Sequence, residues 1–254
     1  MHVTQRALGA LTISLLTATA LAACGSDKDG TTPSSTSSSS SSSSTTTEAE
    51  LPKAAELFDK ARTTALAAQS THITGSVDDD GKPMTIDLAG TTDGSNQSLE
   101  LGVGKGEKAT ILTVGGKYYL LGNDEFWTSQ ISADAAKLLG GKYVRMPAAE
   151  AKEFGDLTIK SLLTELFGDK EMKTALASPD SKVAKATYDG AAAYSITDKT
   201  GKDNGELVVS ADGKATIFKL VGPDDDTGTL EFSEWDKVAK VAAPDPSKVI
   251  NLPK

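Results

Sequence analysis

The chain has almost none of the residues from which disulfides and zinc sites are built. Its 254 residues include a single cysteine, Cys24, and two histidines, His2 and His72. One cysteine excludes an intrachain disulfide, and zinc sites need clusters of cysteine and histidine side chains. Stability must therefore come from a packed core, and no metal or other cofactor is expected.

Basic residues are outnumbered by acidic ones, and long apolar runs are scarce. The formal net charge is -9, which argues against nucleic acid as a partner and against adhesion to anionic lipid headgroups through charge. Beyond the N-terminal segment, no apolar run is long enough to span a bilayer. Hydrophobic residues make up 38% of the chain, a lean share for a globular protein, because a Ser/Thr tract dilutes them.

The N-terminus carries a short apolar stretch that ends at the only cysteine. Arg6 precedes this stretch, and Leu21-Ala22-Ala23 leads directly into Cys24. The pattern is typical of a bacterial lipoprotein signal peptide, residues 1–23, whose removal leaves the cysteine as the first residue. Diacylglycerol on the Cys24 sulfur would supply the two chains that stable anchoring needs. We therefore expect lipidation at Cys24 and a location on the extracytoplasmic face of the cell membrane. The alternative is a free thiol after an ordinary signal peptide.

Two further parts follow the signal peptide. Residues 24–50 contain an unbroken run of serine from Ser37 to Ser44 and have nothing apolar to bury, which predicts a disordered linker after the lipidated cysteine. Leu51-Pro52 opens the folded part, because proline suits the first turn of a helix. We expect residues 51–254 to form a single domain.

Periodicity predicts two blocks of strands on either side of a block of helices. Apolar residues alternate with polar ones in the strand blocks and recur at helical spacing elsewhere. The predicted strands are 72–77, 84–88, 99–103, 109–114, 117–121, 183–188, 192–197, 205–210, 215–221 and 229–233, with extended segments at 143–146 and 249–252. The predicted helices are 52–69, 133–139, 147–154, 158–167 and 169–177. A sheet of about ten strands curls rather than stays flat. We expect an α+β fold, with a strongly curved antiparallel sheet forming a half-barrel and helices covering its concave face.

Catalytic patterns are weak. His72 opens a predicted strand and no nucleophile-elbow motif occurs, so a serine hydrolase is not expected. The aspartate runs 78–80 and 224–226 could do acid–base work or bind calcium, but both fall in predicted turns and neither has the spacing of a known calcium loop. Solvated turns are the simpler interpretation, and the protein is not expected to be an enzyme.

Several soft motifs occur in a characteristic order. Val114-Gly-Gly-Lys-Tyr-Tyr-Leu120 is followed by Phe126-Trp127-Thr128, by the leucine-rich segment 161–167, and by Gly228-Thr-Leu-Glu-Phe-Ser-Glu-Trp235. Over residues 51–252 the chain resembles the actinobacterial envelope lipoproteins of the LppX/LprAFG type. The resemblance implies a fold similar to the LolA/LolB lipoprotein carriers, with an apolar cavity between sheet and helices. It also implies a protein that binds acylated lipids or lipoglycans, with their transfer across the envelope as a further expectation, and that has no enzymatic centre.

Strand and helix periodicity then selects candidates for the cavity wall. Each candidate is either plain core or a ligand contact: Met84, Ile86, Leu88, Leu99, Leu101 and Val103 on the strands, and Leu162, Leu163 and Leu166 on the helical cover. The leading hypothesis is a membrane-anchored lipid-binding lipoprotein, whose partners are a lipid or lipoglycan and the cell membrane. The alternative is a scaffold, sensor or accessory lipoprotein with a packed core and a protein-binding face, whose protein partner the sequence does not identify.

Overall fold

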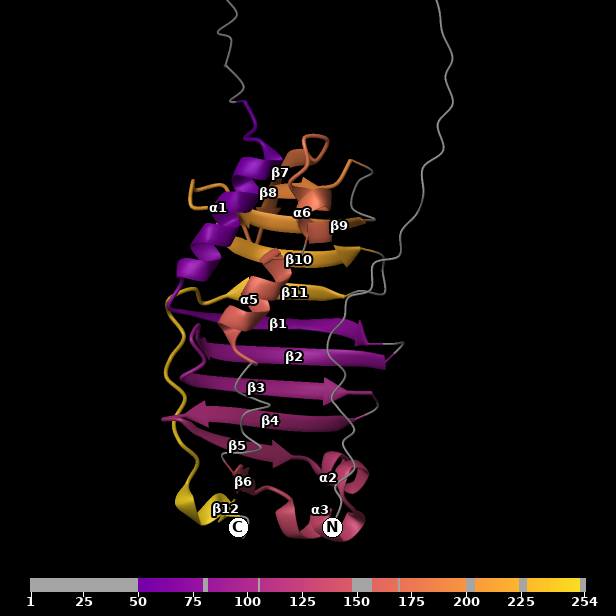
Figure 1. Cartoon of the computed structure of the whole chain (residues 1–254), viewed down its shortest axis with the longest axis vertical. Helices are drawn as coiled ribbons and strands as arrows, with labels where there is room; N and C mark the ends of the chain where they lie inside the picture. Colours follow the sequence, from indigo (N-terminus) through magenta and orange to yellow (C-terminus); the bar gives the residue numbers. More distant parts are fainter. Residues whose placement is uncertain are drawn as a thin grey trace, which may run out of the picture. The chain divides into compact units, whose positions relative to one another are not determined.

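The computed structural model describes residues 50–79, 82–104, 106–147, 157–168, 170–199, 204–223 and 228–251. The predicted signal peptide, Cys24 and nearly all of the predicted linker lie outside these residues. So do the helix predicted at 147–154, apart from its first residue, and the aspartates Asp80 and 224–226. In the part that the structure describes, a twelve-stranded sheet carries five α-helices (Figure 1). The α+β class is confirmed, and the strong curvature stays a prediction.

The sheet joins the two predicted strand blocks edge to edge. Its order is β12-β6-β5-β4-β3-β2-β1-β11-β10-β9-β8-β7 (Figure 1). The first block comprises β1 (Ser70–Asp79), β2 (Lys82–Thr91), β3 (Asn96–Val103), β4 (Glu107–Val114), β5 (Lys117–Gly122) and β6 (Tyr143–Arg145). The second comprises β7 (Lys182–Tyr188), β8 (Ala191–Thr197), β9 (Asn204–Ser210), β10 (Ile217–Pro223) and β11 (Thr229–Ser233). Short turns connect most neighbours, so most pairs are antiparallel hairpins.

The C-terminal tail brings a twelfth strand to the far edge. β12 (Val249–Asn251) pairs in parallel with β6, so the two extended segments predicted from the sequence meet each other. The tail runs along one end of the strands from β11 toward β12 (Figure 1). Asn96 holds it there, because its side-chain Nδ2 donates to Val241 O at 2.9 Å and its Oδ1 accepts from Val241 N at 2.8 Å.

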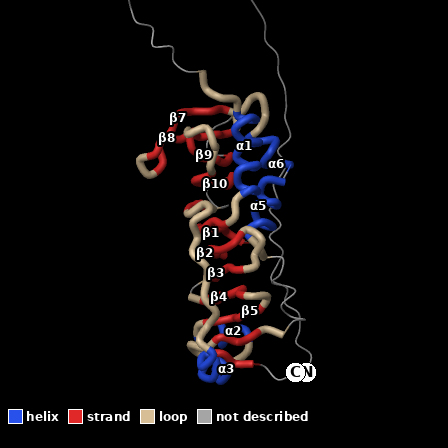
Figure 2. Tube along the Cα trace, turned by 90° about the vertical axis from the view of Figure 1, so that its left-hand side faces the viewer, coloured by secondary structure: helices blue, strands red, loops and turns tan. Residues whose placement is uncertain are grey.

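The helices gather on one face of the sheet, called the helix face below. α1 (Ala54–Ala67), α5 (Ile159–Gly168) and α6 (Lys170–Leu176) lie on the side of the β7–β11 block and β1 (Figures 1 and 2). α2 (Asp124–Gln130) and α3 (Ala133–Leu139) lie at the opposite end, near β5 and β6 (Figure 1). The predicted helical cover is therefore divided into two groups.

The main core lies between α1, α5 and the sheet. Phe58 of α1 and Phe167 of α5 meet edge to face, with ring centroids 5.6 Å apart, and both are fully buried. They share one apolar cluster with Ile73 of β1 and Phe232 of β11. The apolar side chains of α1 and α5 therefore pack against both strand blocks on the helix face.

One short helix of the structure was not predicted from the sequence. The sequence predicts no element at residues 124–130, and the motif residues Phe126 and Trp127 lie there in α2. Seven residues are too few to show helical periodicity, so capping and packing decide the structure here. Asn123 caps the helix by accepting from Phe126 N at 2.9 Å, and Gly122 lets both aromatic rings lie against β5. A Cβ at Gly122 would stand 2.3 Å from the Phe126 ring.

Replacing Asn123 by Ala is expected to lower the free energy of unfolding by about 1–2 kcal/mol. Its side chain accepts from Lys108 N at 3.0 Å as well as from Phe126 N, and donates to Gly106 O at 2.6 Å. The substitution therefore loosens α2 and the β3–β4 hairpin together. Urea unfolding measures the loss, and Gln130→Ala in the exposed end of the same helix should change stability by less than about 0.5 kcal/mol. Equal effects of the two substitutions would contradict this role.

Candidate functional site

The strand register brings the six predicted strand residues together. Met84 lies opposite Val103, Ile86 opposite Leu101, and Leu88 opposite Leu99 on the β2–β3 pair. Side chains directly opposite each other in antiparallel strands point to the same face, and alternate residues share that face. The six side chains form a continuous patch on the helix face, called the apolar stripe below: Met84, Ile86, Leu88, Leu99, Leu101 and Val103.

Burial changes along the apolar stripe. Leu88 and Leu99 are buried, with 4% and 5% of their surface exposed, and they belong to the main core. Ile86 and Leu101 are half-buried and pack against that core. Met84 is half-buried too, but it is not part of the core cluster. Val103, at the other end, has 36% of its surface exposed. The stripe therefore has a closed end at the core and an open end at the surface.

The three predicted helical residues lie on α5. Leu163 and Leu166 are buried in the main core, and Leu162 is half-buried against it. α5 packs against β2, so these side chains stand over one side of the apolar stripe. Whether any of the nine candidates contacts a ligand stays a prediction.

α2 bounds the other side. Trp127 packs with Val144, Ala136 and Leu139 in a second apolar cluster, and its ring lies over Gly122. Gly122 pairs with Ala109, which pairs with Leu101, so small residues separate Trp127 from the apolar stripe. α2 reaches β4 as well as β5, and between α5 and α2 no helix of the described residues crosses β3 (Figures 1 and 2). This part of the helix face is where the sheet carries apolar side chains without a described helical cover.

Two buried polar residues continue the helix face past the closed end of the apolar stripe. Gln97 of β3 lies opposite Thr113 of β4. Among the described residues, neither Gln97 Oε1 nor Thr113 Oγ1 has a hydrogen-bond partner. The sequence analysis missed them, although a signal was present. Gln97 interrupts the alternation of Leu99, Leu101 and Val103 with a polar residue in the apolar phase.

The turn beside this polar pair also positions the start of α5. Lys160 N donates to Thr92 O at 2.9 Å. Within the turn, Asp93 Oδ1 accepts from Ser95 N at 2.9 Å and from Thr91 Oγ1 at 2.7 Å. These hydrogen bonds favour the carboxylate, with the Ser95 backbone N–H acting most strongly, and lower the pKa of Asp93.

Asp93→Asn is therefore expected to reduce stability modestly at neutral pH and not in acid. A carboxyl whose pKa falls on folding stabilises the native state above its unfolded pKa, and this contribution is lost as the pH falls. The difference in urea midpoint between wild type and Asp93→Asn should shrink as the pH drops below the ordinary carboxyl value of 3.8. A difference that does not change with pH would show that the charge has no role in the turn.

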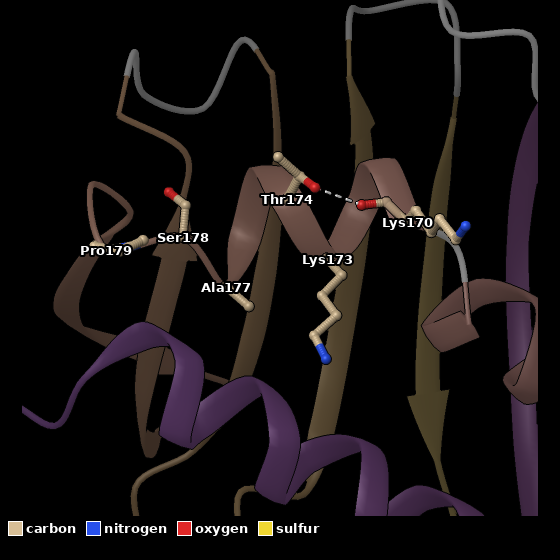
Figure 3. A pocket seen from close by; sticks show the side chains of 6 residues that line it. All are labelled: Lys170, Lys173, Thr174, Ala177, Ser178 and Pro179. Carbon is tan, nitrogen blue, oxygen red and sulfur yellow. Dashed lines mark hydrogen bonds between the residues drawn. The ribbon is translucent and has the colours of Figure 1, made fainter.

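A surface depression lies elsewhere, on α6. Its volume is about 470 Å³, and it is lined by Lys170, Lys173, Thr174, Ala177, Ser178 and Pro179 (Figure 3). Thr174 Oγ1 donates to Lys170 O at 2.7 Å, which is a bond within the helix (Figure 3). None of the lining residues is among the nine candidates for the cavity wall. This depression is thus separate from the predicted lipid cavity.

The structure also places the other residues that were considered for catalysis or metal binding. His72 lies half-buried on the sheet face opposite the helices, with Nε2 at 2.8 Å from Asp87 Oδ1. Asp78 and Asp79 end β1, at the predicted turn. Within the described ranges, no three His, Cys, Asp or Glu side chains gather closely enough to hold a metal ion. The described helices include none with the length and apolarity needed to cross a bilayer.

Comparison with known proteins gives structural matches alone. No family model matches the chain, and no curated protein matches it. The structure is similar to LprF from Mycobacterium bovis, with a TM-score of 0.48 and 14% identity, covering 76% of this chain and 96% of that one. It is also similar to the lipoprotein LppX from Mycobacterium tuberculosis, with a TM-score of 0.44 and 10% identity, covering 74% of this chain and 98% of that one. The structural resemblance predicted from the motifs is confirmed, at low sequence identity.

Proposed function

We propose that this chain is a membrane-anchored envelope lipoprotein whose apolar stripe binds the acyl chains of a lipid or lipoglycan. The observation that carries the proposal is the set of three opposed apolar pairs on β2 and β3, which runs from a buried end to an exposed one. An acyl chain laid along the apolar stripe would remove its own surface and that of the stripe from water. Each buried methylene contributes about 0.8 kcal/mol to the binding free energy. The half-buried residues Ile86 and Leu101 are the central contacts in this proposal.

The proposal includes the parts of the chain that precede the sheet. Residues 1–23 act as the signal peptide, Cys24 carries the lipid anchor, and the linker up to residue 50 tethers a domain of residues 51–254. A flexible linker of this length spans roughly 25–30 Å, which keeps the domain close to the membrane surface. A curved sheet with the apolar stripe on its concave side would enclose more of each acyl chain. Transfer between membranes is a further step of the same proposal, and no enzymatic activity is part of it.

Native mass spectrometry of the protein purified from its own host tests this function. Wild type is expected to copurify with lipid of defined mass, bound to the domain in addition to the covalent anchor. Leu101→Glu should reduce the bound fraction at least about tenfold, because a carboxylate in the middle of the apolar stripe would lose its hydration when the lipid binds. The matched control is Leu138→Glu on α3, where the leucine is 65% exposed, and it should keep the lipid.

Circular dichroism distinguishes a lost ligand from a lost fold. Leu101→Glu should keep the far-ultraviolet spectrum of wild type, since the side chain it replaces is half-buried and β3 is paired on both sides. Wild-type protein that is repeatedly free of bound lipid, although folded, would contradict the proposal.

A scaffold or accessory role is the second candidate, and exposed apolar side chains favour it. Ile131, at the end of α2, and Leu138, on α3, have 62% and 65% of their surface exposed. Exposed apolar groups of this kind suit a protein-binding face when they are contiguous. Lipid-free protein that captures a partner through α2 and α3 would support this second role.

A further inference from the structure

Gln97 and Thr113 form a polar pair in an otherwise apolar part of the helix face. The register places them directly opposite each other, one step beyond the opposed residues Leu99 and Ile111. Only 2% of Gln97 and 3% of Thr113 is exposed. Opposed residues in antiparallel strands have Cβ atoms about 4.5–5.5 Å apart, so one small group between the two side chains can reach both.

The hydrogen bonding of Gln97 determines what that group must be. Its amide Nε2 donates to Leu157 O at 2.5 Å, which leaves the carbonyl Oε1 as the unpartnered atom. Oε1 can only accept a hydrogen bond, whereas the Thr113 hydroxyl can donate or accept. A phosphate or carboxylate oxygen would face the Gln97 carbonyl without a proton to donate. A hydroxyl group satisfies both atoms, by donating to Gln97 and accepting from Thr113.

Two nearby hydroxyls, one on β1 and one in the turn after β2, already donate to backbone carbonyls. Thr71 Oγ1 donates to Ser233 O at 3.0 Å, and Thr92 Oγ1 donates to Ala68 O at 2.6 Å. Buried waters make two to four hydrogen bonds, typically about three, so a water bonded only to Gln97 and Thr113 would be at the low end of this range. A hydroxyl that is covalently part of a ligand can bond the same two atoms and is held there by its own chain.

The position of the pair indicates which part of a ligand would reach it. Val103, at the open end of the apolar stripe, and Gln97 lie on the same strand, six residues apart, or about 20 Å at the rise of a strand. Leu101 and Leu99 lie between the two ends, and Leu99 is buried in the main core, so a tail that enters at Val103 has to part the packing over Leu99 before it reaches the polar pair. The group that arrives there belongs to the inserted end of the tail and not to a headgroup at the surface.

We propose that Gln97 and Thr113 recognise a hydroxyl group near the inserted end of an acyl chain. The proposal rests on the proposed lipid-binding function and deepens it, since it assigns a ligand class: acyl chains hydroxylated far from their head. It also explains why two polar side chains are buried with unsatisfied atoms at the end of an apolar path, where they would otherwise destabilise the fold.

Paired probes test the proposal on the full mature protein. Palmitic acid and ω-hydroxypalmitic acid differ only in the terminal hydroxyl, and native mass spectrometry gives a Kd for each. Wild type should bind the hydroxylated acid about tenfold more tightly. Thr113→Val should lower affinity for the hydroxylated acid about tenfold and leave affinity for palmitic acid within about twofold. Thr113→Ser, which retains the hydroxyl, should keep the preference.

The matched control is Thr110→Val, because Thr110 lies on the same strand and points to the opposite face. It should leave both affinities unchanged. Equal binding of the two acids by wild type would overturn the inference and leave the proposed function intact. A preference that survives in Thr113→Val would overturn it as well. Wild-type protein that binds neither acid and carries no lipid from its host would contradict the proposed function itself.

Discussion

Replacing Cys24 by Ser is expected to abolish the covalent attachment of lipid. In a bacterial lipoprotein the cysteine sulfur carries the diacylglyceryl group through a thioether, and serine has no thiol to form this bond. Cells fed a labelled fatty acid should incorporate label into wild type and none into Cys24→Ser. The intact mass of wild type should correspond to a chain that begins at residue 24 and carries acyl groups. The variant should lack this mass completely.

A matched control and a truncation complete this experiment. Ser26→Ala, two residues further along, should incorporate label as wild type does. A chain secreted by an unrelated cleavable signal and starting at residue 25 should separate from membranes, because the linker and the domain have no other predicted anchor. Wild-type protein with an unmodified, maleimide-reactive Cys24 would contradict the anchor and support the free-thiol alternative.

Phe58→Ala is expected to destabilise the domain by about 3–5 kcal/mol. Phe58 is fully buried in the first half of α1, where its ring contacts Phe167 of α5 edge to face. The substitution removes this contact and leaves a cavity where α1 and α5 meet the sheet. Because α5 also covers the apolar stripe, lipid binding should weaken together with stability. Urea unfolding followed by far-ultraviolet circular dichroism measures the loss.

Leu138→Ala provides the comparison for Phe58→Ala. Leu138 also lies on a helix, but 65% of its surface is exposed, and its loss should change stability by less than about 0.5 kcal/mol. If Phe58→Ala cost no more than this control, the packing of α1 against α5 would not be what stabilises the domain.

Local pattern explains which parts of the fold were predictable. Strands β1 to β5 and β7 to β11 alternate polar and apolar residues and are bounded by turns rich in Gly and Asp, so each could be predicted from the sequence. Ser132 directly precedes the predicted helix 133–139, where a cap belongs, and its hydroxyl accepts from Ala135 N at 3.2 Å. α2 was missed because its seven residues depend on contacts with Gly122 and Lys108, which belong to neighbouring strands.

The sequence by itself determined the α+β class, most of the strands and helices, and the six apolar residues of β2 and β3 that share a phase. It also determined the expected address, because the apolar N-terminal stretch and the single Cys24 are adjacent in the chain. Alternation and capping act over a few residues, so a single sequence records them directly.

The tertiary structure decided how these parts meet. It paired β1 with β11, which lie near opposite ends of the domain's sequence, and it divided the helices into two groups. It also left β3, between these groups, without a described helix across it. It also set Gln97 opposite Thr113 with two unsatisfied atoms. Strand pairing and the satisfaction of a buried polar group depend on residues far apart in the chain, and no local pattern carries that information.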